Sequence, residues 1–288
     1  MKNRTVVITG ATAGIGRAAA LEMARLGASM VVVARNASKA ESLKARVTEA
    51  SVGASVRTFL ADLSSLEQVR RVAAEIAEQV GRIDVLVNNA GIAASRNRST
   101  GEGFDEMLAS NYLGPFLLTH LLTGSLRASA PARVVIVGSE AHRLTGRFDP
   151  ERFEQMGSYS GLNAQLRYGR TKLLDLLWAD HLARLSQGSG FTVNSLCPGF
   201  VATELVRESR LAERPMQVLS ATPIVYTPEQ GARMTVRLAS DPSLEGVTGG
   251  FFSSTPGMGR LPKVRARRDP AIAERVYERT LQLIGAGV

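Results

Sequence analysis

The sequence TVVITGATAGIGRAAALEMARLG, residues 5–27, decides the fold. Its first part, Thr5–Thr9, is a short apolar and β-branched run, which is typical of a strand buried on both faces. Three glycines follow the run: Gly10, Gly14 and Gly16. Glycines between a strand and a helix let the chain turn tightly and let backbone amides approach a phosphate at the helix N-terminus. The amphipathic pattern over Gly16–Leu26 predicts that helix.

The same alternation of strand and helix continues along the chain. Further short apolar runs are Met30–Ala34, Val56–Leu60, Ile83–Val87, Arg133–Val137 and Thr192–Leu196. Helical patterns lie between them, among them Leu66–Val80, Phe104–Leu126 and Gln165–Leu185. Alternation of this kind predicts an α/β fold: a doubly wound parallel sheet with right-handed crossovers and helices on both faces. A ligand is then expected at the carboxyl ends of the strands, where the strand order reverses.

Length and composition favour a single domain over residues 1–288, with 44% hydrophobic and 21% charged residues. The single cysteine, Cys197, excludes an intramolecular disulfide and fits a reducing compartment. Only four residues precede the first apolar run, and no later run reaches the ~18 apolar residues of a membrane span. We therefore expect a cytoplasmic protein with no signal peptide and no membrane partner.

The formal net charge of +9 raises the alternative of nucleic-acid binding. Recognition needs a concentrated basic face or a reading module, whereas the arginines here are scattered. The densest basic cluster comprises Arg260, Lys263, Arg265, Arg267 and Arg268. It lies in a segment that contains proline and glycine and has no interleaved aromatic residues for base stacking. We expect a solvated basic surface and no nucleic-acid partner.

Two connections and the C-terminal tail interrupt the regular alternation. Residues 142–161 follow the fifth predicted strand, and residues 200–227 follow the sixth. Long connections in compact domains are usually lids or mobile loops, and both of these leave carboxyl ends of strands. We therefore expect them to border the ligand cleft as substrate loops. The tail, residues 253–288, is expected to end in a helix over Pro270–Leu283.

The end of the second predicted strand indicates which dinucleotide fits. NAD usually needs an acidic residue there to accept from the ribose 2′-hydroxyl. The strand ends Ala34-Arg35-Asn36, and the next carboxylate is Glu41. An arginine can form charge-assisted bonds with a 2′-phosphate, which a carboxylate repels. The alternative is that Arg35 is an ordinary surface arginine; its position favours NADP.

A candidate proton-transfer pair lies in the helical pattern Gln165–Leu185. Of the five tyrosines, only Tyr168 has a lysine four residues later, Lys172. On a helix this spacing places both side chains on one face, about 5–6 Å apart at Cβ. A neighbouring ammonium favours tyrosinate and is expected to lower the phenol pKa toward neutrality, which makes tyrosine a usable acid or base. By itself the spacing also fits a half-buried helical pair.

Together with the glycine loop, Tyr168-Gly-Arg-Thr-Lys172 resembles the short-chain dehydrogenase/reductase family. Further matching motifs are Asp62-Leu63, Asn88-Asn89-Ala90-Gly91, Asn111, Ser139, Pro198-Gly199 and Thr203, in that order. The resemblance implies a Rossmann fold with a seven-stranded sheet and a bound nicotinamide dinucleotide. The cofactor contacts that it implies are Gly10, Thr12, Gly14, Ile15, Gly16, Arg35, Asn36, Asp62, Leu63, Asn89, Ala90, Gly91, Asn111, Tyr168, Lys172, Pro198, Gly199, Val201 and Thr203.

The resemblance also implies the catalytic roles. Ser139 bonds the substrate oxygen, and Tyr168 transfers the proton. Lys172 lowers the pKa of Tyr168 and holds the nicotinamide ribose, while Asn111 kinks its helix and holds a water near the lysine. The family uses no metal, and the three histidines share no metal-ligand spacing: His120, His142 and His181.

A finer resemblance points to the retinol-dehydrogenase-like branch, which is often NADP-linked and handles bulky apolar carbonyls. It rests on Ala34-Arg35, residues 111–119, Ser139-Glu-Ala-His142, Thr171-Lys172-Leu173, residues 228–232 and residues 246–252. The chain departs from the pattern in two places. Tyr168 follows Ser139 by 29 positions, longer than is usual in the family, and Ala13 stands where NADP-using members often have a basic residue. Arg35, with Arg17, is then expected to supply the phosphate contact.

These features predict an NADPH-dependent reductase of a bulky, largely apolar ketone or aldehyde. One alternative is an NADP-linked alcohol dehydrogenase working in the oxidative direction. Another is a non-catalytic dinucleotide-sensing protein, although such proteins typically lose the tyrosine or the lysine. The partner is expected to be a small carbonyl or alcohol substrate. The helices that contain Asn111 and Tyr168 form subunit contacts in many family members, so the chain is expected to be a monomer or a homo-oligomer.

Overall fold

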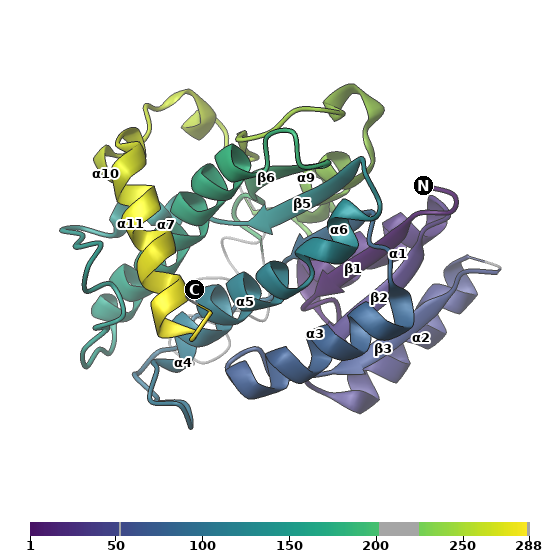
Figure 1. The fold of residues 1–288 in the computed structure, drawn as a ribbon, viewed down its shortest axis with the longest axis horizontal. Helices are drawn as coiled ribbons and strands as arrows, with labels where there is room; N and C mark the ends of the chain where they lie inside the picture. The colour runs from purple at the N-terminus through teal and green to yellow at the C-terminus, as the bar shows by residue number, and fades with distance from the viewer. Residues whose placement is uncertain (52, 202–224, 287–288) are drawn as a thin grey trace.

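A computed structural model describes residues 1–51, 53–201 and 225–286. Its seven strands form one wholly parallel sheet in the order β3-β2-β1-β4-β5-β6-β7 (Figure 1). The strands are β1 Thr5–Thr9, β2 Ser29–Ala34, β3 Val56–Leu60, β4 Val85–Asn88, β5 Ala132–Val137, β6 Phe191–Cys197 and β7 Phe251–Ser253. The strand order reverses between β1 and β4. The predicted doubly wound, seven-stranded parallel sheet is therefore confirmed.

The central strands are buried because helices cover both faces of the sheet. The longer helices are α1 Gly14–Arg25, α2 Ala37–Ala50, α3 Leu66–Val80, α5 Gly114–Leu121, α7 Leu162–Leu185, α9 Pro228–Ser240 and α11 Pro270–Leu283. Side chains of α3, α5, α7 and α11 share one hydrophobic core with one face of the sheet. Side chains of α1, α2 and α9 share a second core with the other face. β3 is an exception to the predicted two-sided burial, because it is an edge strand whose residues are mostly partly buried or exposed.

The helix predicted over residues 104–126 is present from Glu106 to Arg127, but it is not one regular α-helix. The structure has four consecutive pieces there: α4 Glu106–Leu108, the π-helical turn η1 Ala109–Leu113, α5 and α6 Thr123–Arg127. Pro115 has no N–H to bond the carbonyl of Asn111, four residues earlier, so a regular α-helix cannot continue through this point. Gly114 packs so closely that an added Cβ would lie 2.1 Å from the carbonyl oxygen of Leu63. The break therefore falls at the predicted site residue Asn111, as π-helical turns often do at functional sites.

The long connection after β5 packs into the core. It begins with a 3₁₀ turn, η2 Glu140–Leu144, and three of its later side chains are buried: Phe153, Met156 and Tyr159. The Phe153 ring meets Tyr112 edge-on, with ring centroids 5.8 Å apart. The Tyr159 hydroxyl donates to Asp105 at 2.9 Å. This part of residues 142–161 is thus anchored, and its contribution to a substrate pocket stays a prediction.

The C-terminal tail folds back over the core. After the short turns η5 Met258–Arg260 and α10 Arg265–Arg268, α11 lies against α7 (Figure 1). Tyr277 of α11 stacks near Phe116 with ring centroids 5.1 Å apart, and Thr280 bonds the Tyr112 hydroxyl at 2.7 Å. The expectation of a solvated basic tail is wrong for Arg267, which is 7% exposed and bound to Asp180. The pairing could not be predicted from a local motif, because the two residues lie 87 positions apart in the sequence.

Candidate active site

The glycine loop is locked to the end of β4. Gly10 has φ +67°, and a Cβ there would lie 2.7 Å from the Cα of Ala90. The side-chain amide of Asn89 donates to the carbonyls of Thr9 at 3.0 Å and Gly10 at 3.2 Å. The Thr9 hydroxyl accepts from the backbone N–H groups of Asn89 at 3.1 Å and Ala90 at 3.0 Å. Thr9 was not among the predicted site residues, although it directly precedes the first glycine.

The amino terminus of α1 is open to an anion. Its N-cap residue, Ala13, provides no side-chain hydrogen bond to the first turn. Helices α2, α3, α9 and α11 differ from it, because a side chain caps each of them: Asn36, Ser65, Thr227 and Asp269. Helices α5 and α7 also lack a side-chain cap. Uncapped N–H groups at a helix N-terminus, next to a turn with no side chains at Gly14 and Gly16, suit a pyrophosphate. The residues present therefore fit the phosphate part of a dinucleotide.

At the end of β2, the structure places Arg35 beside Asp62. The Arg35 guanidinium is 65% exposed and lies 3.7 Å from a carboxylate oxygen of Asp62. Asp62 also accepts hydrogen bonds from the backbone and hydroxyl of Ser64. The side chain of Asn36 caps α2 by accepting from the Lys39 N–H at 2.9 Å. The exposed Arg35 side chain is thus restrained only weakly by Asp62, and its guanidinium is accessible to a ligand at the end of β2.

The predicted reacting residues converge at the carboxyl ends of β4 and β5. Tyr168 and Lys172 lie on α7, with the Lys172 Nζ 5.8 Å from the centroid of the Tyr168 ring. Ser139 directly follows β5 and the Gly138 turn, and its side chain is close enough to Tyr168 to favour the ionised phenol. Gly91 faces the same space, because a Cβ there would lie 3.7 Å from the Lys172 Nζ. The structure therefore brings together three of the four residues to which the sequence assigned catalysis.

The fourth, Asn111, lies beside this group and is held by its neighbours. Its Oδ1 accepts from the backbone N–H of Ile92 at 2.7 Å, and its Nδ2 donates to the carbonyl of Ile92 at 2.9 Å. The same Nδ2 donates to the Thr171 hydroxyl at 3.0 Å. Asn111 thus ties the turn after β4 to α7, one residue before Lys172. Its predicted role in holding a water stays a prediction.

The ammonium of Lys172 has a partner that the sequence reasoning missed. Its Nζ donates to Asp175 Oδ2 at 2.8 Å and to the carbonyl of Val137 at 3.0 Å. Lys172 is 4% exposed and Asp175 is 2% exposed, so this is a buried ion pair. The only signal in the sequence is an acidic residue three positions after the lysine. Such a pair more often lies on the exposed face of a helix.

The pKa of Tyr168 differs from the expectation. Burial raises the pKa of the phenol, and this effect exceeds the lowering by Lys172, so the pKa lies above its ordinary value. Asp175 adds to the increase by opposing the ammonium. The pKa of Lys172 is also raised: burial alone would lower it, but Asp175 and Tyr168 outweigh that effect. Lys172 does lower the pKa of Tyr168, as the spacing predicted, but burial of the phenol outweighs that effect, so the predicted net lowering is wrong.

His142 supports the serine rather than a ligand. Its Nδ1 lies 2.8 Å from the carbonyl oxygen of Ser139, which requires that nitrogen to carry the proton. The imidazole is buried and meets the Phe251 ring edge-on at 5.5 Å. Burial lowers the pKa of His142, which keeps the ring neutral. His142 therefore fixes the turn that presents the Ser139 hydroxyl.

Beyond β6, only part of the predicted nicotinamide side is described. Gly199 has φ +88°, and a Cβ there would lie 2.7 Å from the Tyr226 ring. Val201 pairs with Tyr226 and packs near Ile15 over Gly231 of α9. Pro198 directly precedes this turn. Thr203 and most of the predicted loop over residues 200–227 lie outside the described residues.

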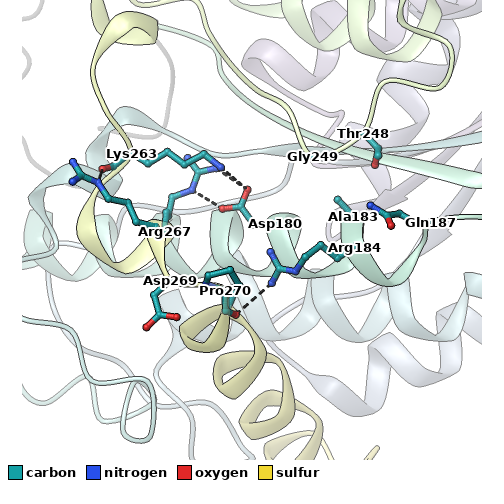
Figure 2. Close-up of a pocket in the computed structure, with 12 residues that line it drawn as sticks. Asp180, Ala183, Arg184, Gln187, Thr248, Gly249, Lys263, Arg267, Asp269 and Pro270 are labelled. Atoms are coloured by element: carbon teal, nitrogen blue, oxygen red, sulfur yellow. Dashed lines mark hydrogen bonds and ion pairs between the residues drawn. The ribbon is translucent and has the colours of Figure 1, made fainter.

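A cavity of about 470 Å³ lies at the far half of α7, away from Tyr168. Figure 2 shows Asp180 on its wall between Lys263 and Arg267, and Arg184 directed toward the carbonyl of Pro270. The charges inside the cavity largely satisfy one another, since Arg267 binds both oxygens of Asp180 and Lys263 lies 3.9 Å from it. The cavity is a feature of the tail junction and contains none of the reacting residues.

Among residues 1–51, 53–201 and 225–286, no three histidine, cysteine, aspartate or glutamate side chains are grouped so that they could hold a metal ion. Within the same ranges, no helix has the length and apolar character needed to cross a membrane.

Comparison with known proteins places the chain among oxidoreductases. Residues 4–148 match the family model described as short chain dehydrogenase. Human retinol dehydrogenase 14 is 35% identical over 301 residues, covering 99% of this chain and 87% of that protein. An uncharacterised protein from Mycobacterium paratuberculosis has a crystal structure with a TM-score of 0.75 and 29% identity, covering 99% of this chain and 95% of that one. The Pseudomonas aeruginosa RhlG/NADP complex has a TM-score of 0.72 and 25% identity, covering 90% and 97%.

Proposed function

The chain belongs to the short-chain dehydrogenase/reductase family, and from that premise we propose that it is an NADPH-dependent reductase of a bulky, largely apolar ketone or aldehyde. Membership makes it an oxidoreductase of alcohols and carbonyls. The observation that carries the proposal is the convergence of Tyr168, Lys172 and Ser139 at the carboxyl ends of the central strands. In a doubly wound sheet that edge is where ligands bind.

The chain's own groups manage the proton of the reaction. When bound, the nicotinamide supplies the hydride. Tyr168 delivers a proton to the substrate oxygen during reduction, and its raised pKa keeps it in the proton-carrying form. The Ser139 hydroxyl donates a hydrogen bond to the same oxygen and stabilises the negative charge that develops there. Lys172 sits behind the phenol and faces Gly91, where it can hold the nicotinamide ribose.

The proposed preference for NADP is based on the residues that follow β2. Arg35 is exposed beyond β2, and residues 34–36 contain no carboxylate to bind a ribose 2′-hydroxyl. A guanidinium can bind a 2′-phosphate through two charge-assisted hydrogen bonds. The structural relative RhlG was crystallised with NADP, which supports the same choice. Arg17, partly buried on the first turn of α1, is the second cation within reach of this end of the site.

The proposed substrate class rests on the relatives. Several of them at 34–35% identity are retinol dehydrogenases, whose substrate is a long apolar alcohol. The test is NADPH or NADH consumption with aldehydes and ketones graded in size and polarity. We expect NADPH to be consumed faster than NADH, and faster with long apolar carbonyls than with short polar ones. Preference for NADH, or no consumption with any carbonyl, would contradict the proposal.

We also propose that the protein is a monomer. Helices α5 and α7, which form subunit contacts in many family members, are covered here by the chain's own α11. The coverage includes the Tyr277–Phe116 ring contact and the buried Tyr112–Thr280 hydrogen bond. Sedimentation at micromolar concentration should give one species of 30.8 kDa. A stable dimer whose interface includes α7 would contradict the proposal.

A further inference from the structure

Asp175 stands in an unusual position for a buried carboxylate. It lies one helical turn after Lys172 on α7, and its Oδ2 accepts from the lysine Nζ at 2.8 Å. Its other oxygen, Oδ1, is buried and has no hydrogen-bond partner among the described residues. The pair is buried on the helix that carries Tyr168, so its charges act on the phenol with little screening by solvent.

The surroundings of Asp175 consist of the proton-transfer machinery and two further titratable groups. Tyr168 and Lys172 face it from α7 itself. The Tyr112 phenol faces it from η1, and its pKa is raised by burial and by Asp175. The Cys197 thiol at the end of β6 adds to the electrostatic field at Tyr168 and Lys172. Within this group Lys172 is the only cation, so Asp175 makes the buried cluster electrically neutral.

We propose that Asp175 is a positioning residue for proton transfer: it fixes the Lys172 ammonium against β5 and offsets part of its charge, which helps to keep Tyr168 as the proton-donating phenol. The proposal rests on the proposed function, in which Tyr168 is the proton donor. The second contact of Lys172, to the carbonyl of Val137 at 3.0 Å, completes the fixed geometry. Asp175 touches neither substrate nor cofactor in this assignment and acts only through Lys172.

The direction of the effect follows from the charges. An unpaired ammonium 5.8 Å from the Tyr168 ring favours tyrosinate, which is the form that removes a proton from an alcohol. A carboxylate next to that ammonium favours the phenol, which is the form that protonates a carbonyl. Burial raises the pKa of Asp175 to about 6, and Lys172 opposes the increase, so the carboxylate is charged at neutral and alkaline pH. Asp175 therefore biases the site toward reduction over the pH range in which Tyr168 could ionise.

The test is a spectrophotometric titration of Tyr168 in the protein without cofactor. Tyrosinate absorbance is recorded within seconds of a pH jump, before alkaline unfolding. The difference between the wild type and Tyr168→Phe isolates the signal of this residue. Asp175→Asn keeps the size of the side chain and removes its charge. We expect the Tyr168 midpoint to fall by about one pH unit or more in Asp175→Asn, as found for charges at this range.

The same variant should move the alkaline limit of NADPH-dependent reduction to lower pH by a similar amount. The matched control is Asp180→Asn, which removes a partly buried, ion-paired carboxylate from the same helix, five residues further on. Its titration midpoint should equal that of the wild type even if its stability falls. A merely structural Asp175 would lower stability and leave the midpoint in place.

A second variant covers the case in which Asp175→Asn does not fold. Lys172→Met/Asp175→Leu replaces the whole ion pair by apolar groups, which buried sites usually tolerate better than the loss of one partner. Because the ammonium acts on Tyr168 more strongly than the carboxylate does, the Tyr168 midpoint in this double variant should rise, but by less than it falls in Asp175→Asn. A rise larger than that fall would show that Asp175 offsets little of the ammonium charge, and an unchanged midpoint in Asp175→Asn would equally overturn the proposal. Because the titration needs no cofactor or substrate, its result is independent of whether the proposed reaction is found.

Discussion

Helix α7 carries a buried ion pair in each half, and the two pairs are built differently. In the half near Tyr168, Lys172 binds one oxygen of Asp175 at 2.8 Å and the other oxygen has no partner among the described residues. In the far half, the Arg267 guanidinium binds both oxygens of Asp180, at 2.8 and 2.9 Å. A planar fork matched to a carboxylate holds a fixed geometry, whereas an ammonium is a point charge. The first pair is thus suited to tuning a neighbouring phenol, and the second to anchoring the tail.

The environment around each pair supports this division. Arg267 lies over the Phe251 ring at 5.1 Å and joins the tail to β7. Phe251 in turn meets His142, which bonds the carbonyl of Ser139. The tail pair therefore supports the serine turn from behind, through packing. The Lys172 pair acts on the phenol directly, through its charge.

The largest effect on stability is expected from Lys172→Met. This change leaves Asp175 buried without a counter-charge, which typically costs about 3–5 kcal/mol. The pKa of Asp175 is already raised to about 6 by burial, and loss of the ammonium raises it further. A carboxyl whose pKa is higher in the folded state favours folding at low pH and loses that contribution as pH rises through the folded pKa. The deficit relative to wild type should therefore be larger at pH 8 than at pH 5 in urea unfolding, and a deficit independent of pH would contradict this.

A smaller loss is expected from Arg267→Ala. Among the described residues Asp180 keeps Lys263, 3.9 Å away, so the free energy of unfolding should fall by less than the ~3–5 kcal/mol typical of a buried charge left unpaired. The reduction rate of the folded enzyme at low temperature should fall much less than stability, because the pair lies beyond the reacting residues. Arg268→Ala is the matched control, since Arg268 is exposed and binds only the carbonyl of Lys263 among the described residues; it should change stability by less than about 0.5 kcal/mol. If Arg267→Ala and Arg268→Ala lowered the free energy of unfolding equally, the Arg267–Asp180 pair would not anchor the tail.

The smallest effect on stability is expected from Arg35→Asp, which removes a third cation–carboxylate contact, exposed at 3.7 Å. Exposed pairs contribute about 0–1 kcal/mol, so unfolding should barely change. Loss of a charged hydrogen bond to the 2′-phosphate should weaken NADPH binding by about tenfold to a hundredfold. NADH binding, followed by the same fluorescence titration, should change little. If the binding of NADPH and NADH were weakened equally, Arg35 would not bind the 2′-phosphate.

Much of the fold could be predicted from the sequence because its signals are local. Short β-branched runs and the glycines after β1 mark parallel strands and a phosphate turn, whatever packs against them. The kink at Asn111 was expected only from the family resemblance, because the apolar periodicity continues through Gly114 and Pro115 and the close contact with Leu63 is visible only in three dimensions. The edge position of β3 likewise depends on strand order, which periodicity does not give.

The site was predicted in part, for a similar reason. Tyr168, Lys172 and Ser139 were found because their motifs are short and ordered along the chain. Asp175 was missed because its spacing from Lys172 does not reveal that both side chains are buried. The burial of Tyr168 itself also reverses the expected shift in its pKa, because desolvation outweighs the lowering by Lys172, and Asp175 adds to the increase. Burial depends on how the whole chain packs, so it cannot be predicted from the spacing between two residues in the sequence.

The most direct test of the account is the rate of NADPH-dependent carbonyl reduction by Tyr168→Phe, measured together with NADPH binding. The phenyl ring keeps the packing on α7 and removes only the hydroxyl that carries the proton. The account predicts that NADPH still binds while the reduction rate falls by about a hundredfold or more, the usual contribution of a positioned general acid. An undiminished rate with bound NADPH would contradict the assignment of Tyr168 as the proton donor.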